Sequence, residues 1–465
     1  VDQLALANQK YWQILPLGPT SYGDSPYQSF STYAGNPYFI DLNTLIEEGV
    51  LTKKECNLAD FGSDSRFIDY GKLYKARYKL LRKAYERSNI SQNPEFQTFQ
   101  EENAWWLDDY SLFMAVKGFF QDECWDKWPE DIKKRYGYAL DYYREQLYFE
   151  VEFQKYMQFE FSIQWKKLKT YANENGIRII GDIPIFVSMD SADVWANQHL
   201  FQLDSKGYPT RVAGVPPDYF SASGQLWGNP LYNWEAHEAE HFSWWISRIR
   251  AQLYNLDILR VDHFRGFEAF WSIPYGELTA VNGEWVKAPG HALFSAVRDA
   301  FEGNLPIIAE DLGIITPEVE ALRDEFGFPG MKVLQFAFDS LDEGSYLPHR
   351  YTSPVCVCYT GTHDNSPVML WKEEAKPKDA AYAAEYLGIG DEPYYWGFIR
   401  GGMRSVALLF VAQMQDYLGL GKGHRMNVPG TASGNWTWRM LPEEISTEVA
   451  EKLYRMTKIY GRLQK

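Results

Sequence analysis

The sequence contains few of the residues that metal or disulfide chemistry requires. It has four cysteines and eight histidines in 465 residues. The cysteines form no CxxC pair and no zinc-ligand spacing, and HExxH, EF-hand and GxSxG patterns are absent. The segment LGLGKGH at 418–424 lacks the spacing and the Ser/Thr of a phosphate-binding loop. We therefore expect no metal ion and no cofactor, and a reduced, cytoplasmic setting.

Long apolar runs and an excess of basic charge are also missing. No apolar run reaches about 18 residues, and no signal or transit peptide is visible. The 62 acidic residues outnumber the 46 basic ones, which gives a net charge of −16. Binding to a phosphate backbone requires a basic face, so we expect neither a nucleic-acid partner nor a membrane partner. The sequence starts at Val1 rather than Met, and we expect further N-terminal sequence before it.

Aromatic residues are abundant. They make up 17% of the chain, with 17 Trp and 32 Tyr. Such rings fill hydrophobic cores, and they also stack on the flat apolar faces of sugars. Composition alone favours the first use and leaves the second open.

From about residue 150 the chain repeats a unit of amphipathic helix, short loop, apolar strand and polar cluster. A helix is predicted over 238–254 because apolar residues recur on one face: Phe242, Trp245, Ile246, Ile249 and Leu253. Very apolar strands follow such helices, which indicates a parallel sheet covered on both faces. The predicted strands lie in IRIIGDIPIFV, LDILRVD, LPIIAED, MKVLQFAF and PVCVCYTGTHD.

The same unit occurs near the start of the chain, in DQLALANQKYWQILPLGP, but residues 43–150 lack it. Those residues contain two amphipathic stretches, KLYKARYKLLRKAYER and ENAWWLDDYSLFMAVKGFF. No low-complexity linker separates them from the rest. We expect a single catalytic domain over residues 1–465, with 43–150 as a helical insertion subdomain.

The alternation fits both a doubly wound sheet and a (β/α)8 TIM barrel. Four acids decide between them, because each lies at or just past the C-terminal end of a different predicted strand: Asp182, Asp262, Glu310 and Asp364. In a barrel that face carries the active site. In an open sheet the acids would gather at one switch point. The sequence therefore predicts an α/β fold of the barrel type.

Asp262, Glu310 and Asp364 are each about one βα unit apart, so they can converge in space. Glycosidic bond cleavage needs one ionised and one protonated carboxyl group. Arg260 projects to the same side of its strand as Asp262 and is expected to keep that acid ionised with a low pKa, whereas Glu310 is expected to have a raised pKa. Barrel-end salt bridges and a Mg²⁺ or Zn²⁺ site are the alternatives. Flanking Arg or His residues and the absence of metal motifs disfavour both.

A series of motifs runs in order from about residue 11 to 439: LPLGPTSYGDSPYQSFSTYAGNPYFIDL, GDIPIFV, GVPPDYFSASGQLWGNPLYNW, LRVDHFRG, IIAEDLG, YTGTHDN and RMNVPGTASGNWTWR. With these motifs the chain resembles the 4-α-glucanotransferases, also called amylomaltases or disproportionating enzymes, of glycoside hydrolase family 77. The family normally has a further segment with the first barrel strand, so we expect that strand to be missing here. Ser366 stands where an acidic residue is expected.

The resemblance implies a role for each matching residue. Asp262 matches the nucleophile, Glu310 the general acid/base and Asp364 the acid that stabilises the transition state. The implied sugar contacts are an aromatic platform, Tyr27; donor-sugar ligands, Asp182, Arg260 and His363; and residues of the loop 214–230 on the acceptor side, Tyr219, Phe220, Gln225 and Trp227.

The implied reaction is a retaining transfer of an α-1,4-glucan segment, through a glucosyl-Asp intermediate, to the 4-hydroxyl of an acceptor. The implied partners are maltooligosaccharides and glucans derived from starch or glycogen. Two alternatives remain. An α-amylase-like hydrolase would use water as the acceptor. A non-catalytic glucan-binding protein would have lost at least one of the three acids, and none is replaced here.

Overall fold

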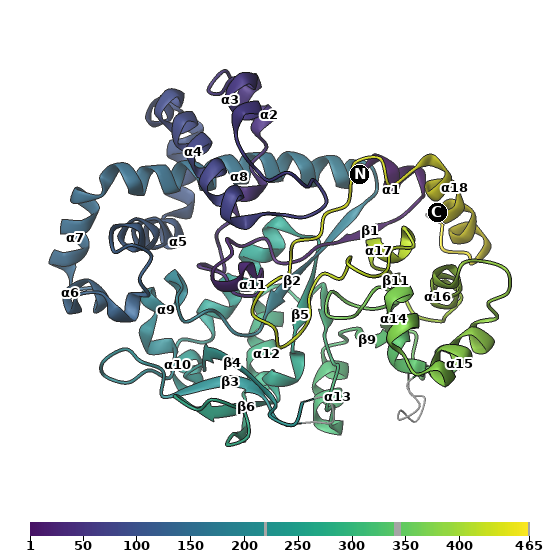
Figure 1. Ribbon diagram of the computed structural model, residues 1–465. Coiled ribbons are helices and arrows are strands. Elements are labelled where there is room, and N and C mark those ends of the chain that lie inside the picture. The colour runs from purple at the N-terminus through teal and green to yellow at the C-terminus, as the bar shows by residue number, and fades with distance from the viewer. Residues whose placement is uncertain (218–220, 339–345, 464–465) are drawn as a thin grey trace.

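Parallel strands at the centre of the molecule carry the predicted acids. The computed structural model describes residues 1–217, 221–338 and 346–463 (Figure 1). The strands form a four-stranded sheet, β1-β2-β5-β8, and a three-stranded sheet, β9-β10-β11. Their bounds are β1 (Tyr11–Gln13), β2 (Arg178–Pro184), β5 (Ile258–Asp262), β8 (Ile307–Ala309), β9 (Gly330–Val333), β10 (Cys356–Tyr359) and β11 (Leu409–Val411).

The two sheets continue one another. The Ala309 amide of β8 donates to the Pro329 carbonyl, just before β9, at 2.9 Å. The spatial order of the strands then equals their order along the chain, and all pairs are parallel. A doubly wound sheet would reverse its order at a switch point, whereas a barrel does not. The predicted barrel-type winding is confirmed, with seven such strands in the described part of the chain.

The strands bury side chains on both faces. One core cluster collects residues from four strands: Ile180, Ile308, Met331, Val333, Val357 and Tyr359. The alternate residues of β2 and β5, such as Ile179 and Leu259, belong to a separate, larger cluster with the surrounding helices. Because strand side chains alternate between faces, the small cluster fills the inside of the strand array.

Helices cover the outside of the strands (Figure 1). The helix predicted over 238–254 is wrong at its start. His241 and Phe242 have left-handed φ angles of 50° and 54°, which no helix continues, so two helices form instead. The covering helices are α8 (Tyr148–Glu174), α9 (Ala192–Ala196), α10 (Trp234–Ala239), α11 (Ser243–Asn255), α12 (Gly290–Ala300), α13 (Pro317–Glu325), α14 (Val368–Glu374), α15 (Pro377–Leu387), α16 (Tyr394–Met403), α17 (Met414–Tyr417), α1 (Asp2–Leu6) and α18 (Thr447–Ile459).

Residues 43–150 are helical, as the sequence predicts. This segment shares one hydrophobic cluster with the barrel helices, in which Phe113 and Trp128 contact Trp195. That shared core supports the proposal of a single domain with a helical insertion. The helices here are α2 (Leu42–Glu47), α3 (Lys53–Leu58), α4 (Tyr70–Ser88), α5 (Pro94–Phe119), α6 (Glu130–Lys133) and α7 (Gly137–Gln146).

An antiparallel sheet was not anticipated from the sequence. It has the order β4-β3-β6-β7, and its strands are β3 (Arg211–Val215), β4 (Gln225–Pro230), β6 (Ala269–Pro274) and β7 (Glu284–Lys287). Within the segment 214–230, which was expected as a loop, residues 214–215 belong to β3 and residues 225–230 to β4, and the two strands pair. A Cβ on Gly214 would lie 2.2 Å from the Gln225 carbonyl oxygen, so the close approach of the strands requires glycine there.

No helix in the described residues has the length and apolarity that crossing a bilayer requires.

Gly181 provides a test of packing behind the site. A Cβ there would lie 2.1 Å and 2.5 Å from the two terminal carbons of the buried Leu256. Gly181→Ala is expected to lower the free energy of unfolding by about 1–3 kcal/mol. Gly118→Ala is the matched control, because nothing lies within 4 Å of its Cβ position in α5. The control should be neutral or stabilising by up to about 1 kcal/mol. Denaturant unfolding measures both, and equal stability of the two variants would contradict this packing.

Candidate active site

The predicted acids converge at the C-terminal ends of the strands. Asp182 lies near the end of β2, Asp262 is the last residue of β5 and Glu310 directly follows β8. Asp364 lies in the turn after β10. Asp262, Glu310 and Asp364 follow mainly apolar stretches of their strands, whereas Asp182 is buried within β2. The predicted convergence of acids is therefore present in the structure.

Arg260 links two of these acids. Its Nη1 donates to Asp182 Oδ2 at 2.6 Å and to Asp262 Oδ1 at 3.0 Å. The side chains of Arg260 and Asp182 are 4% and 2% exposed, whereas that of Asp262 is 29% exposed. A buried guanidinium without carboxylate partners would be very costly, so the three groups stabilise one another. Asp262 is the member of this set that a ligand can reach.

The pKa values of both central acids are raised. Burial is the main cause for Asp262, and the charges of Asp182, Glu310 and Asp364 add to it. The expectation that Arg260 keeps the pKa of Asp262 low is wrong. Arg260 does oppose the increase, but it also neutralises Asp182, so one cation serves two carboxylates.

Glu310 is held by backbone amides. The His263 N–H donates to its Oε2 at 2.7 Å and the Leu312 N–H donates to its Oε1 at 2.8 Å. Burial raises the pKa of Glu310, while Arg260 and these two amides lower it. His263 has a φ of 52°, a conformation that is uncommon for a side chain of this size. The strained backbone after Asp262 thus directs an amide at the neighbouring acid.

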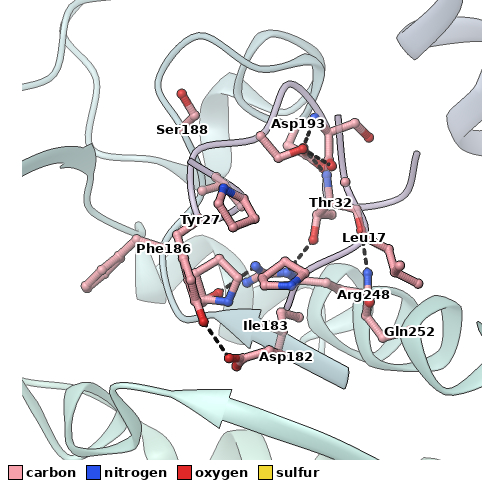
Figure 2. A pocket seen from close by; sticks show the side chains of 17 residues that line it. Leu17, Tyr27, Thr32, Asp182, Ile183, Phe186, Ser188, Asp193, Arg248 and Gln252 are labelled. Atoms are coloured by element: carbon pink, nitrogen blue, oxygen red, sulfur yellow. Dashed lines mark hydrogen bonds between the residues drawn. The ribbon is translucent and has the colours of Figure 1, made fainter. Parts of the chain in front are cut away.

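Tyr27 closes one side of the site. Its hydroxyl donates to Asp182 Oδ2 at 2.7 Å and lies 3.2 Å from His363 Nδ1. Its ring stacks on His363 with centroids 4.9 Å apart and contacts Trp436 at 5.7 Å. Figure 2 shows Tyr27 directed at Asp182, from a segment whose other end is Thr32. An aromatic wall next to the acids is the arrangement that sugar stacking requires.

Hydrogen bonds with two helices, α9 and α11, fix that segment. Thr32 N donates to Asp193 Oδ2 at 2.8 Å. From α11, Arg248 Nε donates to Thr32 Oγ1 at 2.7 Å and Gln252 Nε2 donates to the Thr32 carbonyl at 2.7 Å. Arg248 also donates to the carbonyls of Pro184 and Ile185, at the end of β2. The segment that carries Tyr27 is therefore linked through Arg248 to the end of β2, the strand that carries Asp182.

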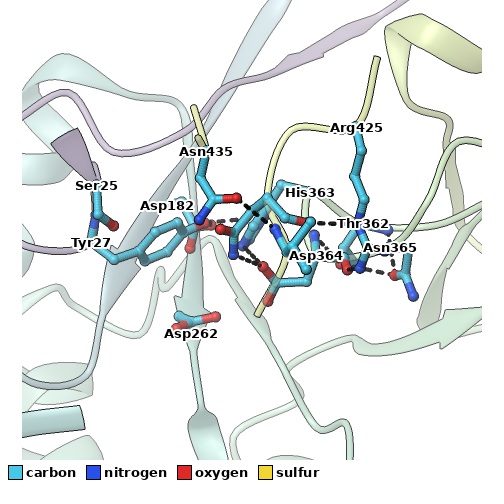
Figure 3. Close-up of polar contacts among 12 residues, drawn as sticks. Ser25, Tyr27, Asp182, Asp262, Thr362, His363, Asp364, Asn365, Arg425 and Asn435 are labelled. Atoms are coloured by element: carbon cyan, nitrogen blue, oxygen red, sulfur yellow. Dashed lines mark hydrogen bonds and ion pairs between the residues drawn. The ribbon is translucent and has the colours of Figure 1, made fainter. Parts of the chain in front are cut away.

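Asp364 is oriented by the segment 424–439. His363 Nε2 lies 3.4 Å from Asp364 Oδ1 (Figure 3). Asn427 Nδ2 donates to the same oxygen at 2.7 Å. Arg425 donates to the Asp364 carbonyl oxygen at 2.6 Å. Asp364 remains 47% exposed at its side chain. It is therefore held in place and open to a ligand at the same time.

Ser366, which stands where an acid was expected, lies in a polar bridge. Arg425 Nη1 donates to Ser366 Oγ at 3.0 Å, and that hydroxyl donates to Glu374 Oε2 at 2.6 Å. Glu374 on α14 therefore supplies a carboxylate beside this position.

The predicted acceptor-side residues are described in part. Trp227 Nε1 donates to Gln225 Oε1 at 3.1 Å, and the Trp227 ring meets the His263 ring edge-on at 4.8 Å. Trp227 therefore lies against His263, the residue after Asp262, and Gln225 bonds to Trp227. Tyr219 and Phe220 lie outside the described residues.

Sequence reasoning missed several residues of the site. His263 and Leu312 act through backbone amides, which no side-chain pattern reveals. Arg425, Asn427 and Trp436 lie in RMNVPGTASGNWTWR, a motif that the resemblance includes without a role for each residue. No group of three or more His, Cys, Asp or Glu side chains within 1–217, 221–338 and 346–463 is arranged to hold a metal ion.

Known proteins are similar to this chain in sequence and structure. A family model described as 4-alpha-glucanotransferase, of glycoside hydrolase family 77, matches residues 1–444. The chain is 49% identical over 466 residues to the 4-alpha-glucanotransferase of Clostridium butyricum, covering 100% of this chain and 95% of that protein. It is 50% identical over 468 residues to the Thermus thermophilus enzyme of the same name, covering 98% and 92%. The amylomaltase of Streptococcus agalactiae in complex with acarbose matches with a TM-score of 0.96 and 40% identity, covering 100% and 94%. The chain belongs to the 4-alpha-glucanotransferases of glycoside hydrolase family 77.

Proposed function

We propose that this 4-alpha-glucanotransferase works by a retaining double displacement on Asp262, with Glu310 as general acid/base and Asp364 as transition-state stabiliser. The observation that carries the proposal is the pairing of Asp262 with Arg260, at 3.0 Å, in a site where the acid is still partly exposed. A carboxylate paired with a guanidinium and open to a ligand is suited to attack a carbon centre.

In the first step an Asp262 oxygen attacks the anomeric carbon of the bound glucan. The bond from that carbon to the leaving oxygen breaks, and the leaving oxygen takes the proton of Glu310. In the second step the 4-hydroxyl of an acceptor sugar gives its proton to Glu310 and attacks the same carbon, which releases Asp262. Two inversions retain the configuration.

The hydrogen-bond partners of Asp262 and Glu310 bear on which of the two acids carries the proton. Asp262 receives a bond from a cationic donor, whereas both oxygens of Glu310 receive bonds from neutral amides. Protonating Asp262 would remove one of the two carboxylates that balance the buried Arg260, whereas the partners of Glu310 are neutral amides. We therefore assign the proton to Glu310, although burial raises the pKa of both acids and the two amide bonds favour the ionised form of Glu310.

Sugar binding follows from the walls of the site. We assign Tyr27 as the platform beneath the transferred sugar, and Asp182, Arg260 and His363 as ligands of its hydroxyls. Gln225 and Trp227, together with Tyr219 and Phe220, belong to the acceptor side. The substrates are maltooligosaccharides and glucans derived from starch or glycogen, which agrees with the acarbose in the Streptococcus agalactiae complex. A cytoplasmic location agrees with four cysteines that are all free.

Glu310→Gln tests the general acid. We expect kcat/KM for maltotriose disproportionation to fall by about 10²–10⁴-fold. In the wild-type enzyme, activity should decline as the pH rises through the raised pKa of Glu310, because the proton is then lost. The residual activity of Glu310→Gln should lack this alkaline limb. Glu320→Gln, at an exposed position on α13, is the control and should keep both rate and profile. An intact alkaline limb in Glu310→Gln would refute the assignment.

Arg260→Met tests how the nucleophile stays ionised. Arg260 is the largest effect that lowers the pKa of Asp262, so its loss should raise that pKa further. Activity requires ionised Asp262, so the acidic limb of kcat/KM should move to higher pH by about 1–3 units. Arg260→Lys keeps the charge and should shift the limb less. An unchanged acidic limb in Arg260→Met, measured where circular dichroism shows the variant folded, would contradict the role of Arg260.

Trp227→Ala tests why transfer exceeds hydrolysis. Water at roughly 55 M competes with the acceptor, so a sugar must be held in position and water kept from the glucosyl ester. Trp227 contacts His263, next to Asp262, from the hairpin on the acceptor side. Its removal should raise the ratio of glucose release to transfer by about tenfold or more. Trp285→Ala, on β7 of the same sheet and 40% exposed, is the control. An unchanged ratio with lower stability would mean that Trp227 is a packing residue.

A further inference from the structure

One fully buried acid, Asp416 on α17, has no part in the mechanism derived above. Both of its oxygens accept hydrogen bonds from neutral groups. Oδ2 accepts the Thr360 hydroxyl at 2.6 Å, and Oδ1 accepts the Val368 amide at 2.6 Å. Burial raises the pKa of Asp416 to about 6, and these two bonds oppose the increase. Burying a carboxylate among neutral partners costs free energy, so we expect it to do something that an apolar residue could not.

The two bonds join the ends of the loop 360–368, which carries Asp364. Thr360 directly follows β10, and Val368 is the first residue of α14. The amide of Val368 is at the start of its helix, where no carbonyl of the helix itself can accept it. An ionised carboxylate offers one acceptor oxygen to each of the two donors and has no proton of its own to place. One side chain, that of Asp416, therefore closes the base of this loop.

The residue before it, Gln415, holds the segment 424–439, which orients Asp364. Gln415 is 4% exposed, and its Nε2 donates to the His424 carbonyl at 3.1 Å. The next residue, Arg425, donates to the Asp364 carbonyl at 2.6 Å (Figure 3). The helix α17 is thus bonded both to the loop that carries Asp364 and to the segment that orients it.

Backbone bonds and apolar packing fix α17 at the ends of β10 and β11. Thr360 N donates to the Val411 carbonyl at 3.2 Å, and Gln413 N donates to Thr360 Oγ1 at 3.4 Å. Tyr417, at the other end of α17, packs against a hydrophobic cluster formed by α16 and α18. Because strand ends and core hold this helix, a carboxylate on it gives the loop a fixed point of attachment.

We propose that Asp416 is a positioning residue for Asp364. Its carboxylate keeps the two ends of the loop 360–368 together, and α17 thereby holds this loop against the segment that orients Asp364. The inference rests on the proposed role of Asp364 as transition-state stabiliser. A displacement of about 1 Å in such a group costs about 10²-fold in rate. An effect confined to the transition state lowers kcat and leaves KM nearly unchanged.

Steady-state kinetics of maltotriose disproportionation test the proposal. Asp416→Ala leaves both donors without an acceptor, so kcat should fall by about 10²-fold with KM within about twofold of wild type. Asp416→Asn keeps the shape of the side chain and one acceptor oxygen, so it should recover most of this loss. Asp379→Ala, at a position on α15 that is 7% exposed, is the matched control and should keep wild-type kcat.

Thr360→Val provides a second test, which remains available where Asp416→Ala does not fold. It removes one of the two bonds and keeps a branched side chain of similar size. The kcat should fall by roughly threefold to tenfold, the effect of one hydrogen bond, again with KM nearly unchanged. Circular dichroism shows whether each variant is folded.

Asp364→Asn separates an effect through Asp364 from a general effect on folding. It should lower kcat strongly, and adding Thr360→Val to it should lower kcat no further, because the positioned group is already lost. Multiplied losses in this double variant, or wild-type kcat in folded Asp416→Ala and Thr360→Val, would overturn the proposal. Wild-type kcat in Asp364→Asn alone would refute the proposed role of Asp364, and the role of Asp416 with it.

Discussion

The Arg260 guanidinium is buried among carboxylates, and the geometry of the whole site depends on satisfying it. It cannot lose its proton, so the fold must supply anions within hydrogen-bond distance. Asp182 and Asp262 do so from two adjacent strands. The same constraint limits what the cation can do, because its charge is divided between them. Burial then dominates, and the pKa of Asp262 rises. The ionisation of Asp262 therefore depends on the charge of the groups beside it.

Sheet hydrogen bonding sets the relation between the two central acids. Glu310 N donates to the Val261 carbonyl at 3.0 Å, and Phe264 N donates to the Glu310 carbonyl at 3.0 Å. These bonds extend the pairing of β5 and β8 beyond the strands themselves. Glu310 is thereby fixed beside Asp262 by backbone, while His263 N binds its side chain. Backbone positioning of this kind involves no rotatable side chain, so it limits the freedom of the acid more than a side-chain contact would.

The parts of this structure that could be predicted from the sequence are those in which apolar residues recur with a regular spacing. Strands such as β8 and β10 consist of apolar residues directly followed by polar ones, so their ends, and hence the acids there, could be predicted. The prediction of one helix over 238–254 is wrong because the apolar pattern gives no sign of the left-handed backbone at His241 and Phe242, which ends one helix before the next begins. The antiparallel sheet was missed because its strands lie outside the repeated helix-and-strand unit, and β3 pairs with β6, which is distant in the sequence. The raised pKa of Asp262 depends on how Arg260 is shared between Asp182 and Asp262 in space. The spacing of residues along the chain does not reveal this.

The aromatic residues show why composition could not decide between core packing and a role in the site, since some rings are buried in the core, another faces the acids, and the two sets are connected. Trp244 and Trp245 are buried on α11, and the Arg248 guanidinium lies 5.4 Å and 4.7 Å from their ring centroids. That stacking fixes a side chain which is 1% exposed and donates to Thr32 and to the end of β2. Through Thr32 the core rings hold the segment of Tyr27, a ring that faces the acids. Packing of the buried Trp rings therefore helps to determine the position of Tyr27 in the site, because closely packed rigid rings hold Arg248 in one geometry where flexible side chains would not.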